Sequence, residues 1–154
     1  MAVKENFEPT LKFILNAEGG YTVDHAGPTQ MGLTLRLMKA LRLDLDHDGD
    51  VDGADVRLVT VDVVRQAFKK EFWDRVGADK LPAGIDLQAA DFAYNAGPMA
   101  ASQMLYNPLD PILIRERRIA FYESLCKRNP AKYAKYRHGW INRAMGAYEA
   151  AMRL

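Results

Sequence analysis

The sequence lacks the features that define several large classes of protein. Its 154 residues include one cysteine, Cys126, so an internal disulfide framework and a cysteine-rich zinc module are excluded. The three histidines are scattered along the chain and form no zinc-binding pattern. No run of about 18 apolar residues is present, so we expect no membrane insertion. A formal net charge of only +1 argues against a generic nucleic-acid-binding protein.

The N-terminal segment also lacks the apolar stretch of a signal peptide, because Glu5 and Glu8 lie among its apolar residues. We therefore expect synthesis in the cytoplasm without a signal peptide. The chain has 154 residues, 49% of them hydrophobic, and this is enough to bury a core without disulfides. We expect one domain, residues 1–154, because no linker or repeat divides the chain.

Apolar residues recur at helical spacing along most of the chain. The predicted helices cover residues 7–18, 34–41, 62–72, 85–97 and 140–152, with further helices starting at the prolines of Gly97-Pro98, Asp110-Pro111 and Asn129-Pro130. Segment 85–97 has almost no polar face, which indicates a central, buried helix. Only residues 21–33 are typical of a short hairpin or irregular β region. The sequence thus predicts a mainly α fold with one minimal β or irregular lobe.

The strongest local pattern is a cluster of six aspartates within residues 44–55. Their spacing matches the ligand positions of an EF-hand or dockerin-type calcium loop, with Gly49 at the sharp turn. Carboxylates this close repel one another unless a hard cation gathers them. The sequence therefore predicts a structural Ca²⁺ ion held by Asp44, Asp46, Asp48, Asp50 and Asp55. At the position of Asp50, such loops normally contribute the backbone carbonyl.

Two features limit this interpretation. Asp55 occupies the last loop position, where a longer Glu usually binds with both oxygens. We therefore expect weaker binding and a narrower preference for calcium over magnesium. A single loop without a full partner helix also argues against a calcium sensor. The simplest alternative is a solvated acidic loop between helices. No organic cofactor is indicated.

Glu18 lies at the end of the first predicted helix, directly before Gly19 and Gly20. The negative end of the helix dipole disfavours an ionised carboxylate there, and the two glycines leave room for a polymer to approach. A second carboxylate, Asp24, follows in a loop that can fold back. Glycoside hydrolysis needs such a division of labour between a proton donor and a second polar group. From spacing alone, however, a Glu before two glycines is more typical of a solvent-facing residue near a helix end.

Short motifs that follow one another along the chain strengthen the catalytic interpretation. They cover residues 13–21, 32–34, 72–74, 81–82, 91–98 and 139–143. Together they resemble glycoside hydrolase family 108, bacterial and phage N-acetylmuramidases related to the lysozyme superfamily. The last motif resembles the end of the family's peptidoglycan-associated C-terminal region. The resemblance implies a lysozyme-like fold, with the catalytic Glu in residues 1–80 and a helical, peptidoglycan-associated region in residues 81–154.

By this resemblance Glu18 is the general acid that protonates the oxygen between N-acetylmuramic acid and N-acetylglucosamine. The loop after it is shorter than the family usually has, which leaves the second group open. Asp24 is the only acidic candidate in the loop, and Thr29 or Thr34 can instead position the water. The distance between the carboxyl groups, which decides the stereochemical outcome, is not given by the sequence.

The other candidate substrate-binding residues are Tyr21, His25, Tyr94 and Asn95. Asn95 has poor helix propensity inside a predicted helix, so its presence needs a reason. It either caps the helix end or binds a neighbouring backbone group, or its amide holds a sugar N-acetyl group or supports Glu18. Trp73 is more typical of a core residue than of a sugar-stacking residue.

The favoured function is therefore an endolysin-like muramidase that acts as a monomer on peptidoglycan glycan strands. Two alternatives remain: a lytic transglycosylase, and a non-catalytic, calcium-stabilised peptidoglycan-binding module. A phage enzyme without a signal peptide needs a holin-type lesion to reach the wall. Residues 111–154 carry ten Lys or Arg against three Glu, an excess that favours an anionic wall polymer.

Overall fold

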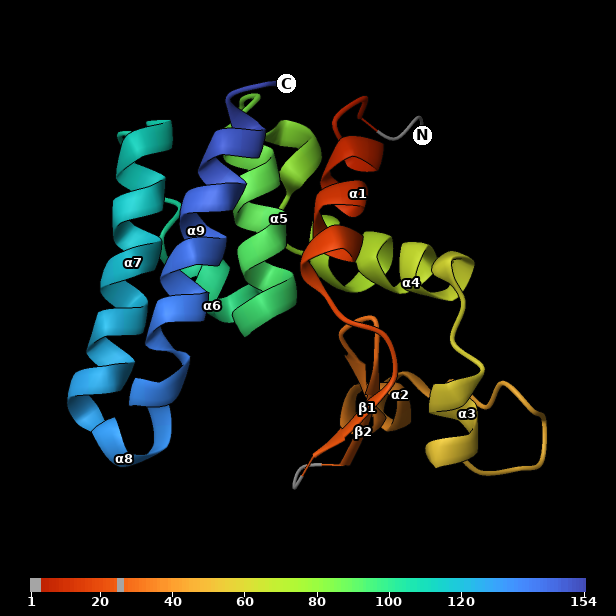
Figure 1. Cartoon of the computed structure of the whole chain (residues 1–154). Helices are drawn as coiled ribbons and strands as arrows, with labels where there is room; N and C mark the ends of the chain where they lie inside the picture. Colours follow the sequence, from red (N-terminus) through yellow and green to blue (C-terminus); the bar gives the residue numbers. More distant parts are fainter. Residues whose placement is uncertain (1–3, 25–26) are drawn as a thin grey trace.

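The computed structural model describes residues 4–24 and 27–154 and confirms a mainly helical protein with one small sheet (Figure 1). Its first part contains α1 (Phe7–Ala17), β1 (Thr22–Asp24), β2 (Gly27–Gln30), β3 (Leu33–Thr34), α2 (Leu35–Leu41), α3 (Gly53–Arg57), α4 (Val61–Phe68), the π-helical turn η1 (Lys69–Trp73) and the 3₁₀ turn η2 (Ala78–Lys80). The second part contains α5 (Ile85–Ala96), α6 (Pro98–Gln103), α7 (Pro111–Arg128), α8 (Pro130–Tyr133), the 3₁₀ turn η3 (Ala134–Tyr136) and α9 (Arg137–Ala151). His25, a predicted substrate-binding residue, lies outside the described residues.

Helix α5 is the centre of the core, as its apolar sequence predicts. Every residue from Ile85 to Tyr94 is buried, because α1, α6, α7 and α9 all pack against this helix. A helix without a polar face is stable only when it is covered on all sides. Polar residues in this helix therefore need partners inside the protein, and Asp91 is one of them.

The predicted β lobe is a three-stranded antiparallel sheet in the order β1-β2-β3. Strands β2 and β3 are joined by the two residues Met31 and Gly32, which both have positive φ, 49° and 86°. Such a two-residue turn matches the right-handed twist of the strands it connects. The Tyr94 hydroxyl donates a hydrogen bond of 2.8 Å to the Met31 carbonyl, which fixes the turn against α5.

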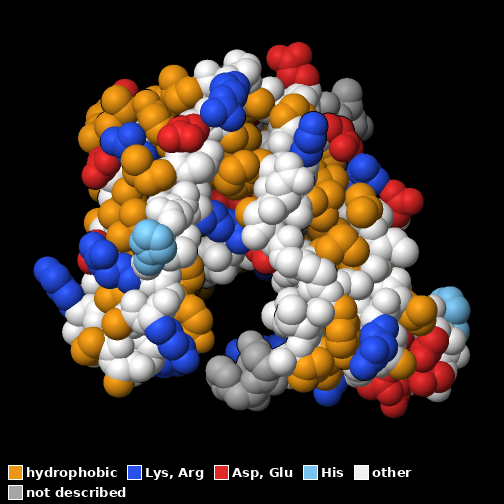
Figure 2. Space-filling model, in the orientation of Figure 1, with side chains coloured by type: hydrophobic (Ala, Val, Ile, Leu, Met, Phe, Trp, Pro, Cys, Tyr) orange, Lys and Arg blue, Asp and Glu red, His pale blue; other side chains and the backbone are white. Residues whose placement is uncertain are grey.

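A hollow separates the two sides of the molecule. In Figure 1, α7, α8 and α9 lie on one side, and the sheet with α2 and α3 lies on the other. Figure 2, in the same orientation, shows a deep notch between the α8 end and the sheet side. Helix α1 leads from the helical part into the sheet at this notch. Among the described residues, no helix is both long and apolar enough to cross a membrane.

The predicted starts of several helices are confirmed by their caps. The side chain of Thr34 accepts from the Leu37 amide, and Asp110 accepts from the amides that follow Pro111. Asn129 caps α8 in the same way. Each cap is a local interaction, which explains why the sequence alone predicts it.

The predicted helix over 62–72 differs from the structure. Helix α4 ends at Phe68, and the backbone widens into the π-helical turn η1. The wider turn brings the side chains of both Phe72 and Trp73 into the core below Phe68, and all three are buried. The last helix begins at Arg137 rather than at Trp140, because the interior of α9 accommodates Gly139.

Candidate functional site

Glu18 lies where α1 ends and the chain enters the sheet. Its amide donates to the Ile14 carbonyl, while its own backbone is extended, with φ −90° and ψ 148°. The carbonyl of the next residue, Gly19, accepts a hydrogen bond of 3.1 Å from the Met31 amide at the β2–β3 turn. The side chain is 21% exposed, so the carboxyl group is held by the protein but remains open to solvent.

The β2–β3 turn packs directly against the Glu18 carboxyl group. A Cβ atom added at Gly32 would lie 3.0 Å from Glu18 Cδ and 2.5 Å from a ring carbon of Tyr94. The motif over residues 32–34 therefore needs glycine for a close approach as well as for its positive φ. This contact places the Glu18 carboxyl group against the β2–β3 turn of the sheet.

Arg143 contacts Glu18 from the opposite side. This residue lies on α9, and its Nη1 donates to Glu18 Oε1 at 2.5 Å. Its Nη2 donates to Asp91 Oδ1 at 2.8 Å, so one guanidinium bridges two carboxylates. Burial opposes the charge of Arg143, but Asp91 and Glu18 outweigh burial and raise the pKa of the guanidinium.

Asp91 is the centre of a buried ionic network. It is fully buried on α5 and accepts a hydrogen bond of 2.7 Å from Arg118 Nη1 on α7. Arg118 Nε donates to the hydroxyl of Tyr122 at 3.0 Å, and that hydroxyl donates to Asn95 Oδ1 at 2.5 Å. Burial raises the pKa of Tyr122, so its hydroxyl stays protonated and remains a donor.

These contacts bear on two predicted substrate-binding residues. Asn95 Oδ1 accepts from the Tyr122 hydroxyl, which is a side-chain group and not the backbone group that the sequence predicts. Tyr94 is buried and its hydroxyl binds Met31, and burial together with the Glu18 charge raises its pKa. Both residues therefore hold the scaffold around Glu18. Their binding of substrate stays a prediction.

The predicted residues of the sheet lie close to one another. Thr29 pairs with Thr22 on one side and with Thr34 on the other, so the three threonines form one row across the sheet. The side chain of Thr34 is engaged in capping α2. The Tyr21 ring lies 4.4 Å from the guanidinium carbon of Arg57.

Asp24, the predicted second carboxylate, ends strand β1, and its backbone pairs with Gly27. Its side chain lies outside the described part of the chain. The distance between the carboxyl groups of Glu18 and Asp24 therefore stays open, and so does the choice between Asp24 and a threonine as the second group.

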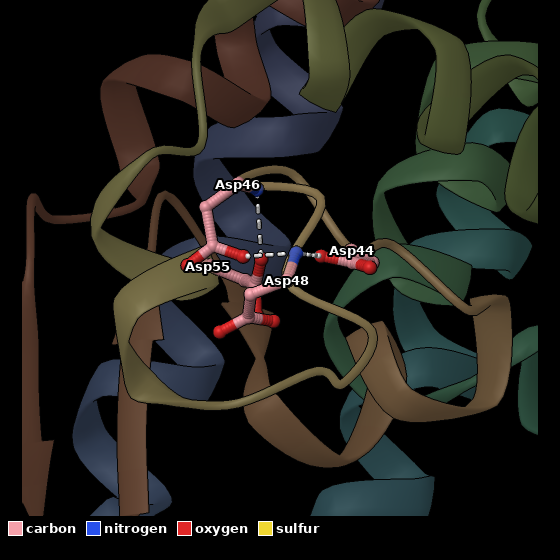
Figure 3. A group of neighbouring side chains, drawn as sticks. All are labelled: Asp44, Asp46, Asp48 and Asp55. Atoms are coloured by element: carbon pink, nitrogen blue, oxygen red, sulfur yellow. Dashed lines mark hydrogen bonds between the residues drawn. The ribbon is translucent and has the colours of Figure 1, made fainter.

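Four of the predicted metal ligands lie together (Figure 3). Carboxylate oxygens of Asp44, Asp46, Asp48 and Asp55 all lie within 4.8 Å of one another. Asp50 belongs to a neighbouring group with Asp48 and Asp52. Desolvation and the neighbouring charges raise the pKa of Asp46 to about 6. Within the ranges that the structure describes, none of these aspartates forms an ion pair with Lys or Arg.

Asp55 closes the loop through the backbone. Its Oδ1 accepts from the amides of Leu45 and Asp46, at 2.7 and 3.2 Å, and its Oδ2 accepts from the Asp52 amide at 2.8 Å. The hydrogen bond from Asp52 and the other amides lower the pKa of Asp55, although burial opposes them. A cluster of negatively charged carboxylate oxygens is suited to bind Ca²⁺ or Mg²⁺. Helix α3 after the loop has five residues, so the predicted absence of a full partner helix is confirmed.

Sequence reasoning proposed no role for Asp91, Arg118 or Arg143. The available signal was Asp91, since a carboxylate in a helix that is predicted to be buried requires a partner inside the protein. Arg143 lies 52 residues from Asp91 and 125 residues from Glu18, so spacing alone could not pair them.

A mainly helical fold, with a small sheet beside a Glu at the end of the first helix, defines a lysozyme-like protein. A model of the family "Glycosyl hydrolase 108" matches residues 11–97, and the chain belongs to this family. The match includes Glu18 and Asp91, whereas Arg118 and Arg143 lie beyond it.

A solved structure with the same fold is that of SagA from Brucella abortus. It shares 24% sequence identity and superposes with a TM-score of 0.80, over 98% of this chain and 96% of SagA. The shared fold therefore includes the C-terminal helices that the family match does not cover. Among curated proteins, no sequence matches this chain.

Proposed function

We propose that this protein is a peptidoglycan hydrolase, an endolysin-like N-acetylmuramidase, in which Glu18 is the general acid. The observation that carries the proposal is the position of the Glu18 carboxyl group. The β2–β3 turn reaches it from the sheet side of the notch, and Arg143 reaches it from the helical side. A glycan strand lying in the notch would bring a glycosidic oxygen to this carboxyl group.

The two oxygens of Glu18 differ in their surroundings. Oε1 accepts from Arg143, whereas Oε2 accepts no hydrogen bond from the residues that the structure describes. We assign the transferable proton to Oε2, which gives it to the oxygen between N-acetylmuramic acid and N-acetylglucosamine as the β-1,4 bond breaks. Asp24, or a hydroxyl of the row formed by Thr29 and Thr34, then stabilises the positive sugar or positions the attacking water.

Replacement of Glu18 tests the assignment of the acid. Glu18→Gln keeps the size of the side chain but removes the transferable proton, so clearing of a peptidoglycan suspension should slow by about 10²-fold or more. Glu8→Gln is the matched control, because Glu8 lies on the same helix and is exposed. Circular dichroism checks that both variants stay helical. A Glu18→Gln variant that clears the suspension at the normal rate would show that the acid is assigned wrongly.

Mass spectrometry of the released muropeptides tests the reaction type. Hydrolysis leaves new reducing ends on N-acetylmuramic acid, and this is the expected product. Anhydro-muramyl ends would identify a lytic transglycosylase instead. Binding to peptidoglycan without any released product would identify a non-catalytic binding module.

We also propose that the loop over residues 44–55 holds a structural Ca²⁺ ion. Asp44, Asp46 and Asp48 would supply side-chain oxygens, with Asp50 contributing from the backbone and Asp55 at the far end of the loop. The ion would neutralise the charges of these aspartates, because none of them forms an ion pair with Lys or Arg in the described part of the chain. The loop lies between α2 and α3, so its role is to stabilise the sheet side of the protein rather than to react.

A further inference from the structure

Arg143 is bound on one side by a buried carboxylate. Its Nε and Nη2 both donate to Asp91 Oδ1, at 3.2 and 2.8 Å. Arg118 Nη1 holds the other oxygen of Asp91 at 2.7 Å, and the side chains of Arg118 and Asp91 are 1% and 0% exposed. A buried carboxylate that loses a partner costs several kcal/mol, so this arrangement resists rearrangement.

The Nη1 atom of Arg143, which does not bind Asp91, donates to the carboxyl group of Glu18. The planar guanidinium is oriented by Asp91, and this leaves Nη1 directed at Glu18 Oε1. Helix α9 does not depend on this contact for its packing, since it also packs against α7 and α5. The ion pair between Arg143 and Glu18 therefore serves the geometry of the Glu18 carboxyl group.

We propose that Arg143 is a positioning residue for Glu18: it holds Oε1 in place, so that Oε2 faces the glycosidic oxygen. The inference rests on the proposed role of Glu18 as the general acid. It makes the C-terminal helices part of the catalytic apparatus, through the series Arg118, Asp91, Arg143 and Glu18. A lysine at position 143 carries the charge but cannot hold both carboxylates in a fixed plane.

The test compares Arg143→Met and Arg143→Lys with Arg65→Met. Arg65 is the matched control because it also contacts two carboxylates, those of Glu8 and Asp62, but lies outside the site and outside residues 111–154. We expect Arg143→Met to lower kcat roughly 10- to 100-fold with little change in KM, because a displaced acid fails mainly at the chemical step. Arg143→Lys should recover part of this loss. Arg65→Met should leave kcat unchanged.

The split between kcat and KM, together with the partial recovery of kcat by Arg143→Lys, separates positioning from a merely structural role. Thermal unfolding of each variant shows how much of the effect comes from stability.

The outcomes separate this inference from the proposed function. If Glu18→Gln is inactive but Arg143→Met keeps the normal kcat, Arg143 does not position the acid. If Glu18→Gln is active, the role of Glu18 itself is wrong. If Arg143→Met does not fold, Arg143→Lys decides: a folded lysine variant with unchanged kcat overturns the inference, and one with reduced kcat at unchanged KM supports it.

Discussion

The backbone at Gly32 lies so close to the Glu18 carboxyl group that a side chain at this position would collide with it. Its φ of +86° is also one that residues with a Cβ adopt only at a cost. Position 32 therefore meets two separate requirements: the turn between β2 and β3 needs a positive φ, and the Glu18 side chain needs open space. Only glycine meets both.

We predict that Gly32→Ala lowers activity more than it lowers stability. The added Cβ must displace Glu18 or Tyr94, since the nearest atoms are at 3.0 and 2.5 Å. Crowding of this kind costs about 1–3 kcal/mol of unfolding free energy, and a displaced acid lowers kcat about 100-fold. Denaturant unfolding and rates of suspension clearing measure the two effects.

Gly77→Ala is the control for the backbone cost alone. Gly77 also has positive φ, +69°, but a Cβ there meets nothing within 4 Å. Gly77→Ala should lower the free energy of unfolding by an amount of the same order as Gly32→Ala, without lowering kcat. Equal loss of kcat in both variants would mean that general destabilisation, and not the crowding of Glu18, explains the effect.

The residues of the site were predictable only where their evidence is local. Glu18 is followed directly by Gly19 and Gly20, and the resemblance of residues 13–21 to the family's motif selects it as the expected acid. The pairing of Arg143 with Asp91 depends on how α9 crosses α5, which follows from packing of the whole chain. A carboxylate such as Asp91 in a buried helix indicates that a partner inside the protein exists. It does not indicate which residue that partner is.

The same distinction holds for whole elements. Helix starts that depend on a nearby cap, such as Thr34 or Asn129, were predicted and are present. The widening of α4 into η1 was not predicted, because apolar residues over 62–72 fit an uninterrupted α-helix equally well. The π turn forms because Phe68, Phe72 and Trp73 must all enter the same core, a demand that only tertiary packing imposes.

The loop over residues 44–55 allows a test at the scale of one element. If Ca²⁺ binds the folded loop alone, calcium at about 100-fold above its Kd adds about 2.7 kcal/mol of stability. For a chain of this size the melting temperature should then rise by roughly 5–10 °C. Asp44→Ala combined with Asp48→Ala should abolish the rise. Magnesium should give a smaller rise, because the loop offers several carboxylates and an irregular geometry.

The control for this test removes two acidic residues outside the loop. Glu5 and Glu149 are exposed, so Glu5→Ala combined with Glu149→Ala lowers the negative charge equally and should keep the calcium effect. Differential scanning calorimetry with calcium or with a chelator measures all three proteins. No change in melting temperature at millimolar calcium would leave the segment as a solvated acidic loop.

At the scale of the whole molecule, the near-neutral charge hides two opposed regions. The loop over residues 44–55 carries six aspartates without Lys or Arg, whereas residues 111–154 carry ten Lys or Arg against three Glu. Helices α7 and α9 of this basic region also reach the site, through Arg118 and Arg143. The region that holds the Glu18 carboxyl group is thus also suited to attract an anionic polymer.

This charge separation predicts salt-dependent binding to peptidoglycan. Lys132 and Lys135 are exposed in α8 and η3, so Lys132→Glu combined with Lys135→Glu should weaken binding to isolated cell walls about tenfold at low salt. The difference from the unmodified protein should vanish near 1 M salt, where the screening length falls to about 3 Å. Lys12→Glu combined with Lys70→Glu makes the same charge change on exposed sites outside the C-terminal helices and should weaken binding less. Sedimentation with cell walls over a salt series measures this, and equal weakening by both pairs would mean that only the net charge matters.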